Sequence, residues 1–292
     1  MAEKTNPGFG DLEAPFRSFE TSQTVLLPIP FDKTSSYGKG ADAGPQALLE
    51  ASRYVELWDI ETQSEPYRSG IFTDAPILGD SPEELTSKSH KRVGELLKKR
   101  KFIISLGGEH SVSVGPIKAF SEHFQKLTVL QLDAHTDLRE SYLGSRLNHA
   151  CVMARAQEMV DRVVAVGIRS LDSTELGRVK ADNVFYAERI VGQKGWVKEV
   201  VSRLGQQVYI TLDLDVFDPS IMPSTGTPEP GGLGWYEVLA FLRTVFEQRE
   251  VVGCDVVELA PTPANSAPDF LAAKLVYKMI TYKHGLKRTN EH

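Results

Sequence analysis

The sequence predicts an α/β fold in which helices cover both faces of a mainly parallel sheet. Strand-like and helix-like segments alternate along the chain, and most of the strand-like segments are continuous apolar runs. Such runs are typical of parallel strands, which are buried on both faces. No linker and no internal repeat divides the 292 residues. We therefore expect one domain over residues 1–292, with residues 1–22 as a polar N-terminal arm.

The first half of the chain predicts strands and helices in turn. Pro45 suits the first turn of a helix, and Ser81 with Glu84 has the spacing of a helix cap. The helix that Ser81 opens ends in basic residues, which favours the helix dipole. Apolar runs predict strands at 24–29, 70–72, 102–106 and 128–132, and helices are expected at 46–54, 82–99 and 112–124.

The second half continues the alternation. Apolar runs predict strands at 163–168, 184–186, 208–212 and 251–259, and helices are expected at 149–159, 173–181, 196–204, 235–248 and 267–282. Residues 219–234 hold four prolines and four glycines, so they form a long loop. Loops of that length in compact domains are usually functional.

Composition excludes several classes of protein. The net charge is −6 and there is no dense stripe of Lys or Arg, so we expect no nucleic-acid partner. The two cysteines form neither a disulfide framework nor a zinc-binding spacing. No apolar run approaches the ~18 residues that a membrane helix needs, so we expect no membrane partner. The polar N-terminus lacks the apolar core of a signal peptide, and a cytoplasmic location is expected.

Potential metal ligands follow two of the predicted strands. Asp133, His135 and Asp137 come directly after the run at 128–132, at every second position. If the strand continued, alternation would point all three side chains to one side. Asp213 and Asp215 repeat the spacing after 208–212, and His110 follows the strand at 102–106. Because ligands bind at the carboxyl ends of parallel strands, we expect these residues to meet.

Four aspartates at one site require compensating positive charge. Like charges repel, and burial disfavours the ionised form of a carboxyl group. Two divalent cations would cancel the four negative charges. Oxygen donors mixed with two imidazoles suit Mn²⁺ well, while Fe, Co, Ni and Zn are chemically acceptable. Two such metals about 3.5–4 Å apart acidify a water between them. The residues therefore predict a site for two divalent cations per chain, for which Mn²⁺ is well suited.

Four ordered motifs resemble those of the ureohydrolases, the family of agmatinase, arginase and their relatives. They are Gly-Gly-Glu-His-Ser at 107–111, Asp-Ala-His-Thr-Asp at 133–137, Asp-Leu-Asp-Val-Phe-Asp-Pro at 213–219 and Asp-Val-Val-Glu-Leu-Ala-Pro at 255–261. The loop at 224–232 also matches, and the resemblance covers residues 24–283. It implies a three-layer α/β/α fold of the arginase and deacetylase type, with a dinuclear manganese site.

The resemblance also implies roles for single residues. One metal would be held by His110, Asp133, Asp137 and Asp213, and the other by Asp133, His135, Asp213 and Asp215. A hydroxide bridging the two Mn ions would attack the guanidinium carbon, which Glu258 would hold as a bidentate partner. His149 would transfer a proton to the leaving amine. Asp137 would also stabilise the tetrahedral intermediate.

The segment before His149 bears on the choice of guanidine. Arginase-like members carry an Asn-, Ser- and Thr-rich loop there to grip the α-carboxylate of the substrate, and residues 140–148 lack that pattern. Agmatine, hydrolysed to putrescine and urea, is therefore the expected substrate. Arginine and guanidinobutyrate stay open as alternatives, the latter because Arg146 could bind a carboxylate. The expected substrate contacts beyond Glu258 are Asn148, Thr227 and Asp172.

Two readings from other classes stay open. The chain could be an inactive relative that binds only metal or a partner, although all six ligands, His149 and Glu258 are present. It could also be a deacetylase-like hydrolase with one zinc ion, which the metal content would test. The resemblance further implies a homo-oligomer, either a trimer or a hexamer.

Overall fold

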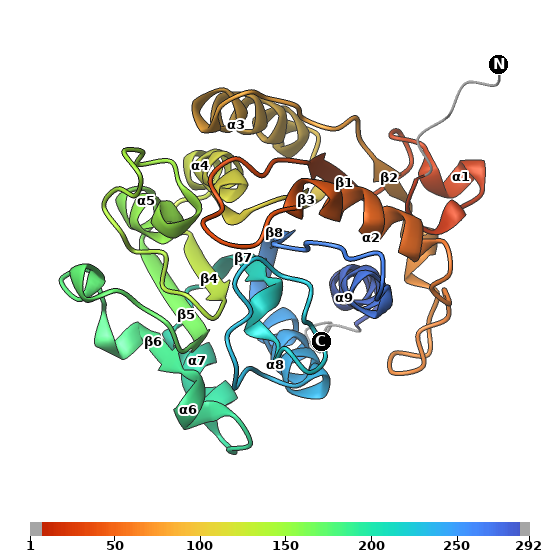
Figure 1. Cartoon of the computed structure of the whole chain (residues 1–292). Helices are drawn as coiled ribbons and strands as arrows, with labels where there is room; N and C mark the ends of the chain where they lie inside the picture. Colours follow the sequence, from red (N-terminus) through yellow and green to blue (C-terminus); the bar gives the residue numbers. More distant parts are fainter. Residues whose placement is uncertain (1–7, 287–292) are drawn as a thin grey trace.

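An eight-stranded sheet forms the centre of the molecule in the computed structural model, which describes residues 8–286 (Figure 1). Every pairing between these strands is parallel, as the apolar runs predict, and their order across the sheet is β2-β1-β3-β8-β7-β4-β5-β6. The strands are β1 (Thr24–Ile29), β2 (Ile71–Thr73), β3 (Phe102–Gly107), β4 (Thr128–Leu132), β5 (Arg162–Ile168), β6 (Val184–Tyr186), β7 (Gln207–Asp213) and β8 (Glu250–Val257).

Helices cover both faces of the sheet, which gives the three-layer α/β/α arrangement (Figure 1). One hydrophobic core lies between the sheet and α3 (Pro82–Lys98), α4 (Val114–His123) and α5 (Val152–Met159). The other core lies between the sheet and α2 (Gly44–Ser52), α7 (Trp196–Arg203), α8 (Trp235–Gln248) and α9 (Ala267–His284). The short helices α1 (Ala14–Arg17) and α6 (Ala187–Ile190) lie near opposite ends of the sheet.

Three of the inner strands are buried along their whole length. Every residue of β1, β3 and β4 is buried, which explains why their sequences are continuous apolar runs. Ser81 caps α3 as predicted, since its hydroxyl accepts a hydrogen bond from the Glu84 amide at 3.2 Å. None of the helices within residues 8–286 is both long and apolar enough to cross a membrane.

Two local predictions are wrong. The helix expected at 173–181 is only a single 3₁₀ turn, η6 (Ser173–Glu175), because the Glu175 carboxylate turns inward and accepts a hydrogen bond from the Leu138 amide at 2.9 Å. The strand before the first ligands ends at Leu132, so alternation along a strand does not align residues 133–137. Asp137 instead has a left-handed backbone, with φ at +51°.

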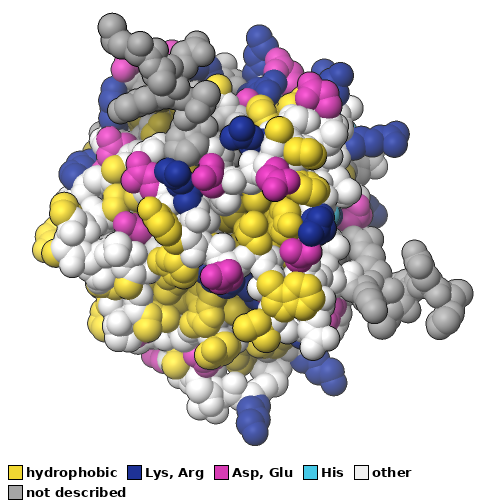
Figure 2. Space-filling view, turned by 90° about the vertical axis from the view of Figure 1, so that its right-hand side faces the viewer, with side chains coloured by type: hydrophobic (Ala, Val, Ile, Leu, Met, Phe, Trp, Pro, Cys, Tyr) yellow, Lys and Arg dark blue, Asp and Glu magenta, His cyan; other side chains and the backbone are white. Residues whose placement is uncertain are grey.

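The N-terminal segment packs on its own chain. Residues 1–7 of the expected arm lie outside the described part, but Phe9 and Leu12 are buried in the core beside α2 and α9. The ring of Phe9 stacks on Tyr277 with 6.1 Å between centroids. Figure 2 shows apolar side chains gathered on the face that carries α1 and α2. The homo-oligomer expected from the resemblance stays a prediction.

Candidate active site

Four neighbouring strands in the middle of the sheet bring the candidate site together. Across the sheet they lie in the order β3, β8, β7, β4. His110 follows β3, Glu258 follows β8, Asp213 ends β7, and residues 133–137 follow β4. Because these strands are parallel, their carboxyl ends meet at one edge, which is where ligands bind in open α/β sheets. Residues far apart in the sequence thus share one site.

Two site residues have backbone conformations that side chains rarely adopt. Asp137 has φ at +51° and Glu258 has φ at +68°. Such conformations cost free energy and concentrate at functional sites. Hydrogen bonds hold both in place, because the Glu258 amide donates to the Gly108 carbonyl at 2.8 Å and the Met153 amide donates to the Asp137 carbonyl at 3.0 Å.

His110 is the centre of the first group of candidate ligands. Its Nδ1 lies 3.2 Å from Asp133 Oδ2, 3.0 Å from Asp137 Oδ2 and 3.4 Å from Asp213 Oδ2. All four side chains are buried. Within residues 8–286, Nδ1 has no hydrogen-bond partner of acceptable geometry. Buried polar atoms are almost always paired, so this nitrogen calls for a partner between it and the carboxylates.

His135 is the centre of the second group. Its Nδ1 lies 2.9 Å from Asp215 Oδ2 and 3.7 Å from Asp133 Oδ1. The ligand atoms of Asp133, His135 and Asp215 lie within 4.8 Å of one another, and so do those of His110, Asp133 and Asp213. Asp133 therefore belongs to both groups. The structure brings all six predicted metal ligands to one place.

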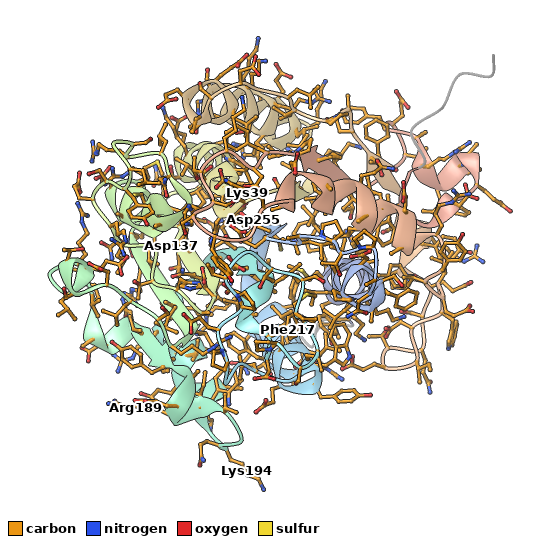
Figure 3. All side chains as sticks on the ribbon, viewed as in Figure 1. Lys39, Asp137, Arg189, Lys194, Phe217 and Asp255 are labelled. Atoms are coloured by element: carbon orange, nitrogen blue, oxygen red, sulfur yellow. The ribbon has the colours of Figure 1, made fainter. Side chains whose placement is uncertain are left out.

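The cluster holds an excess of buried negative charge. Among the described residues, the four aspartates have ion-pair contacts only with His110 and His135, and with no lysine or arginine. In Figure 3, Asp137 lies inside the molecule near the ends of the central strands, whereas Arg189 and Lys194 project outward. The protein itself therefore supplies too little positive charge for this site.

The pKa values express the same imbalance. Burial and the charge of Asp133 raise the pKa of Asp137 to about 7. Burial, with Asp215 and Asp133 beside it, raises the pKa of Asp213 well above its usual range. Burial opposes a charged imidazole, yet Asp215 and Asp133 raise the pKa of His135 to about 12. Protons are thus drawn into the site to offset charge that cations would offset better.

Residues behind His110 fix which of its nitrogens faces the cluster. Thr211 Oγ1 donates to Asp255 Oδ1 at 2.6 Å, so its oxygen is left to accept from His110 Nε2 at 2.9 Å. Tyr209 donates to the other oxygen of Asp255 at 2.7 Å. With Nε2 protonated, a neutral imidazole directs the lone pair of Nδ1 at three carboxylates. That arrangement fits a metal ion, and supporting contacts of this kind are usual around metal ligands.

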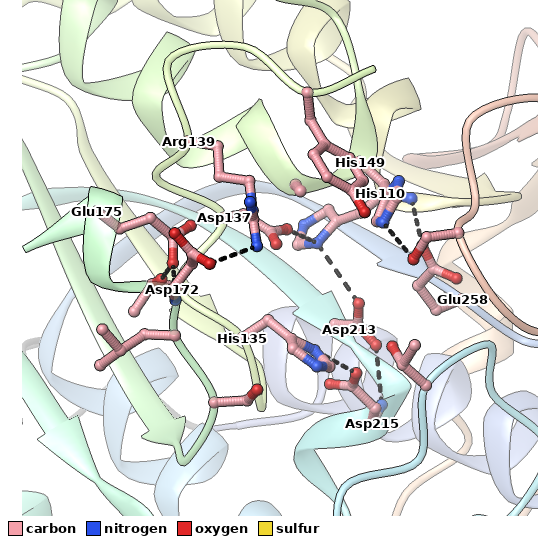
Figure 4. Close-up of a pocket in the computed structure, with 17 residues that line it drawn as sticks. His110, His135, Asp137, Arg139, His149, Asp172, Glu175, Asp213, Asp215 and Glu258 are labelled. Carbon is pink, nitrogen blue, oxygen red and sulfur yellow. Dashed lines mark hydrogen bonds and ion pairs between the residues drawn. The ribbon is translucent and has the colours of Figure 1, made fainter.

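A pocket of about 200 Å³ opens over these ligands (Figure 4). Glu258 forms part of its wall and is 8% exposed, with Oε1 accepting a hydrogen bond from the His110 amide at 2.7 Å. Burial, together with Glu109, raises the pKa of Glu258 well above its usual range. The pocket is lined by Ser36, His110, His135, Thr136, Asp137, Arg139, Tyr142, His149, Ala150, Ser170, Leu171, Asp172, Glu175, Asp213, Asp215, Thr227 and Glu258.

His149 lies on the pocket wall between two hydroxyl groups. Its amide donates to Thr34 Oγ1 at 3.0 Å, its Nδ1 lies 3.4 Å from the same oxygen, and its Nε2 lies 3.5 Å from Ser36 Oγ. Burial lowers the pKa of His149 to about 4, although a hydrogen bond to the Thr34 backbone acts in the opposite direction. Its imidazole is therefore neutral at pH 7 and able to accept a proton.

Two of the three further substrate contacts predicted from the sequence line the pocket, and the third does not. Thr227 and Asp172 line the pocket, and Asp172 Oδ2 lies 3.1 Å from Arg139 Nη2. Asn148 is not among the lining residues, because its side-chain oxygen caps η5 (His149–Cys151) by accepting from the Ala150 amide at 3.1 Å. Its contact is with the backbone that carries His149.

Arg146 points to acidic partners and does not line the pocket. Its Nη2 lies 2.8 Å from Glu140 and 2.9 Å from Glu158. Both ion pairs are partly exposed and therefore weak individually, but together they occupy the guanidinium. The carboxylate-binding role considered for Arg146 has no support in this geometry.

Sequence reasoning missed several residues that shape the site. Thr34 and Ser36 lie between β1 and α2, in a segment to which no role was assigned from the sequence, and Asp255 was noted only as part of a motif. Arg139 and Tyr142 pack together, with the guanidinium carbon 4.6 Å from the ring centre. Position at the carboxyl end of a strand was the available signal for Thr34 and Ser36, but many loop residues share it.

Comparison with known proteins identifies the family. The sequence model that describes the arginase family matches residues 22–281. The N(1)-aminopropylagmatine ureohydrolase of Synechocystis sp. is 39% identical over 91% of this chain and 90% of its own length. The agmatinase of Pyrococcus horikoshii is 33% identical over 92% of this chain and 95% of its own length. The agmatine ureohydrolase of Thermoplasma volcanium has a TM-score of 0.84 and 30% identity, over 92% of each chain.

These matches extend over nearly the whole described chain and include all four motifs. They agree with the parallel sheet and with the Asp and His cluster at its carboxyl edge. The chain belongs to the arginase family of ureohydrolases.

Proposed function

We propose that the chain hydrolyses the guanidino group of a substrate of the agmatine class, whose tail carries a positive charge. One observation carries the proposal: two groups of metal ligands share Asp133 and lie beneath a pocket walled by Glu258. Water adds to the guanidinium carbon, the bond from that carbon to the alkyl nitrogen breaks, and the released amine takes up a proton. The products are urea and the amine, with no change in oxidation state.

Two divalent cations, which we propose to be Mn²⁺, would complete the site. A cation pair supplies a water acidic enough to react at neutral pH. The tautomer of His110 and the shared Asp133 support two ions. The first would be held by His110, Asp133, Asp137 and Asp213, and the second by Asp133, His135, Asp213 and Asp215.

Glu258 would bind and orient the guanidinium. A carboxylate and a guanidinium match as two parallel hydrogen bonds, and the interaction is stronger in a buried site than in water. The positive charge of the guanidinium would also offset the burial that raises the pKa of Glu258. Asp137 would stabilise the tetrahedral state, because it borders both the metal ligands and the pocket.

His149 would move the proton that the departing amine needs. Its imidazole is neutral at pH 7, since burial lowers its pKa to about 4. The hydroxyl groups of Thr34 and Ser36 lie within 3.5 Å of its ring nitrogens and would hold its orientation. General acid–base groups of this kind typically contribute 10²–10⁴-fold to rate.

The outer part of the pocket favours a tail that ends in an ammonium group. Thr227 lines it and offers a hydroxyl acceptor, while Asp172 lines it with one oxygen paired to Arg139 and the other accepting from Thr174. The cations that a substrate carboxylate would need are already paired, Arg139 with Asp172 at 3.1 Å and Arg146 with Glu140 and Glu158. Arginine and guanidinobutyrate are therefore disfavoured relative to agmatine.

A second candidate substrate is agmatine extended by an aminopropyl group. Two relatives that act on N(1)-aminopropylagmatine by name are 39% and 38% identical to this chain, above the 33% of the agmatinase from Pyrococcus horikoshii. The apolar side chain of Leu171 lies on the pocket wall next to Asp172. The methylene groups of the aminopropyl extension would contact Leu171, and its terminal ammonium group would lie near Asp172.

Urea release from a panel of guanidines tests the proposal. The Mn²⁺-loaded chain should act on agmatine and N(1)-aminopropylagmatine at least about 100-fold better, in kcat/KM, than on arginine or guanidinobutyrate, which corresponds to ~2.7 kcal/mol. Glu258→Gln should abolish most of this activity and keep the metals. No urea from any guanidine, with two metals bound, would sink the proposal and leave the inactive-relative reading. A single bound zinc would favour the deacetylase-like one.

A further inference from the structure

Arg169 ties together three segments at the carboxyl edge of the sheet. It lies immediately after β5, and within residues 8–286 its guanidinium donates to main-chain carbonyl groups alone. The acceptors are Glu229 at 3.2 Å and Pro230 at 3.0 Å for Nε, Gly167 at 3.1 Å for Nη1, and Asp215 at 2.6 Å, Phe217 at 3.3 Å and Glu229 at 2.7 Å for Nη2.

The first tied segment carries a metal ligand. Asp215 lies in η8 (Leu214–Val216), the 3₁₀ turn that follows β7. Its side chain reaches His135 at 2.9 Å, while its carbonyl accepts from Arg169. Phe217, two residues on, accepts from the same nitrogen. The guanidinium therefore holds the backbone on both sides of residue 216, and through it the direction of the Asp215 carboxylate.

The second tied segment belongs to the long loop at 219–234. Glu229 and Pro230 are its anchored residues, and Thr227, two residues earlier, lines the pocket. The Glu229 carboxylate also lies 3.9 Å from Nε2 of His135. One side chain thus fixes the loop that faces the substrate and the turn that bears Asp215.

The hydrogen bonds of Arg169 support one of the two groups of metal ligands more than the other. Asp215 and His135 belong to the second group, and both are next to a segment that Arg169 holds. His110 and Asp137 belong to the first group and are held from the other side, by Glu258, Thr211 and Met153. Loss of Arg169 should therefore disturb one metal position far more than the other.

We propose that Arg169 is a positioning residue for the second metal and for the substrate loop at 219–234. The inference rests on the proposed function for its substrate part, but its metal part stands independently. Arginine suits the task because its planar, permanently charged group offers five donors in a fixed arrangement, whereas lysine offers three from a single atom.

Arg249 provides a matched control. Its guanidinium also donates to main-chain carbonyl groups, to Leu204 at 3.3 Å, Gln248 at 2.8 Å and Val201 at 2.7 Å. It precedes β8, however, and so lies at the amino-terminal edge of the sheet, opposite the candidate site. Both guanidinium groups donate to main-chain carbonyl groups, Arg169 through six contacts and Arg249 through three, and the two residues lie at opposite edges of the sheet.

The test is a calorimetric titration of the full, chelator-treated chain with Mn²⁺ alone. Wild type and Arg249→Gln should each bind two ions with matching affinities. Arg169→Gln should keep the first affinity and lose about 10–100-fold in the second, as is usual when a residue supporting a metal ligand is removed. Arg169→Lys should lie between them, and it serves as the test if Arg169→Gln does not fold. At saturating Mn²⁺, Arg169→Gln should recover kcat and keep a raised KM.

Other outcomes overturn the inference. If both Arg169 variants bind both Mn²⁺ ions with wild-type affinities, Arg169 does not position the second metal. An equal loss in Arg249→Gln would show a general effect of stability. If the wild type binds fewer than two Mn²⁺ ions, there is no second metal for Arg169 to position, and the inference is wrong. Two ions without urea release from any guanidine would defeat the proposed function and leave the metal part of the inference intact.

Discussion

Two charge clusters in this molecule are built in opposite ways. The metal-site cluster is made of Asp133, Asp137, Asp213 and Asp215 with His110 and His135. The α9 cluster is made of Lys278, Asp59 and Glu61 with Arg243 and Tyr282. In the α9 cluster, Lys278 lies 2.8 Å from Asp59 and 2.5 Å from Glu61, and Arg243 lies 2.9 Å from Glu61. Its two carboxylates, Asp59 and Glu61, are paired with two cationic side chains, Lys278 and Arg243.

The pKa values separate the two clusters. Burial would raise the pKa values of Asp59 and Glu61, but hydrogen bonds and charge from Lys278 lower both. In the metal-site cluster, burial and neighbouring carboxylates raise the pKa values of Asp137 and Asp213. A cluster that balances its own charge serves the fold, whereas one that does not balance its charge requires cations from outside.

The largest expected effect comes from replacing a ligand carboxylate. Asp213→Asn should lower kcat/KM by more than about 100-fold, because even residues that only support metal ligands contribute 10–100-fold in affinity or activity. The same change should raise the unfolding temperature of the metal-free chain, since it removes one repelling charge. Thermal unfolding with chelator and with Mn²⁺, alongside urea release, measures both. A lower metal-free unfolding temperature would contradict the charge argument.

Removing Lys278, one of the two bases of the α9 cluster, should weaken the fold and leave the metal site intact. Lys278→Met leaves Asp59 and Glu61 without their shared partner and should destabilise the chain by about 3–5 kcal/mol. Its effect on Mn²⁺ affinity should be negligible, because the cluster lies apart from the metal ligands. Urea unfolding and Mn²⁺ titration test the pair of expectations. The double change Lys278→Met with Asp59→Asn should restore part of the stability.

His149 borders the metal-site cluster without belonging to it. His149→Asn should lower kcat by at least about 100-fold, the lower end of the usual range for a group that transfers protons. Both Mn²⁺ ions should remain, since within residues 8–286 the side-chain hydrogen bonds of His149 are with Thr34 and Ser36 and not with a metal ligand. Single-turnover rates and metal content check this. Loss of a metal in the variant would assign His149 a different role.

The smallest effect concerns His284, a half-buried histidine outside both clusters. Burial, with the charge of Lys283, lowers the pKa of His284 to about 4, and its Nε2 lies 2.9 Å from Thr24 Oγ1. Because the folded pKa lies below the unfolded value of about 6.5, its stabilisation is present above pH 6.5 and is lost as pH falls toward 4.

His284→Gln keeps a polar group for Thr24 and removes the titration. Between pH 7.5 and 5, the metal-free wild type should lose about 1–2 kcal/mol more stability than this variant. Urea midpoints at the two pH values measure the difference. Equal losses would mean that the pKa of His284 is the same in the folded and the unfolded chain.

The sequence allowed the fold and most of the site to be predicted, for reasons that differ by residue. Continuous apolar runs identify buried parallel strands, and the six metal ligands follow such runs directly. The helix expected at 173–181 failed because Glu175 is used in tertiary contacts, which a local pattern does not reveal. The left-handed backbone of Asp137 was equally hidden.

Residues that act through the backbone were the hardest to predict. Arg169 bonds to carbonyl groups from three segments, and nothing in its neighbours along the chain indicates them. Thr34 and Asn148 hold His149 in the same indirect manner. Such roles depend on where strand ends meet in space, which follows from the strand order across the sheet.

Metal content tests the central claim most directly. The chelator-treated chain, equilibrated with excess Mn²⁺ and freed of unbound ions, should hold two Mn²⁺ per chain, and its unfolding temperature should rise with each ion bound. One ion or none per correctly folded chain would mean that the buried carboxylates are neutralised by protons alone, and the account of this site would be wrong.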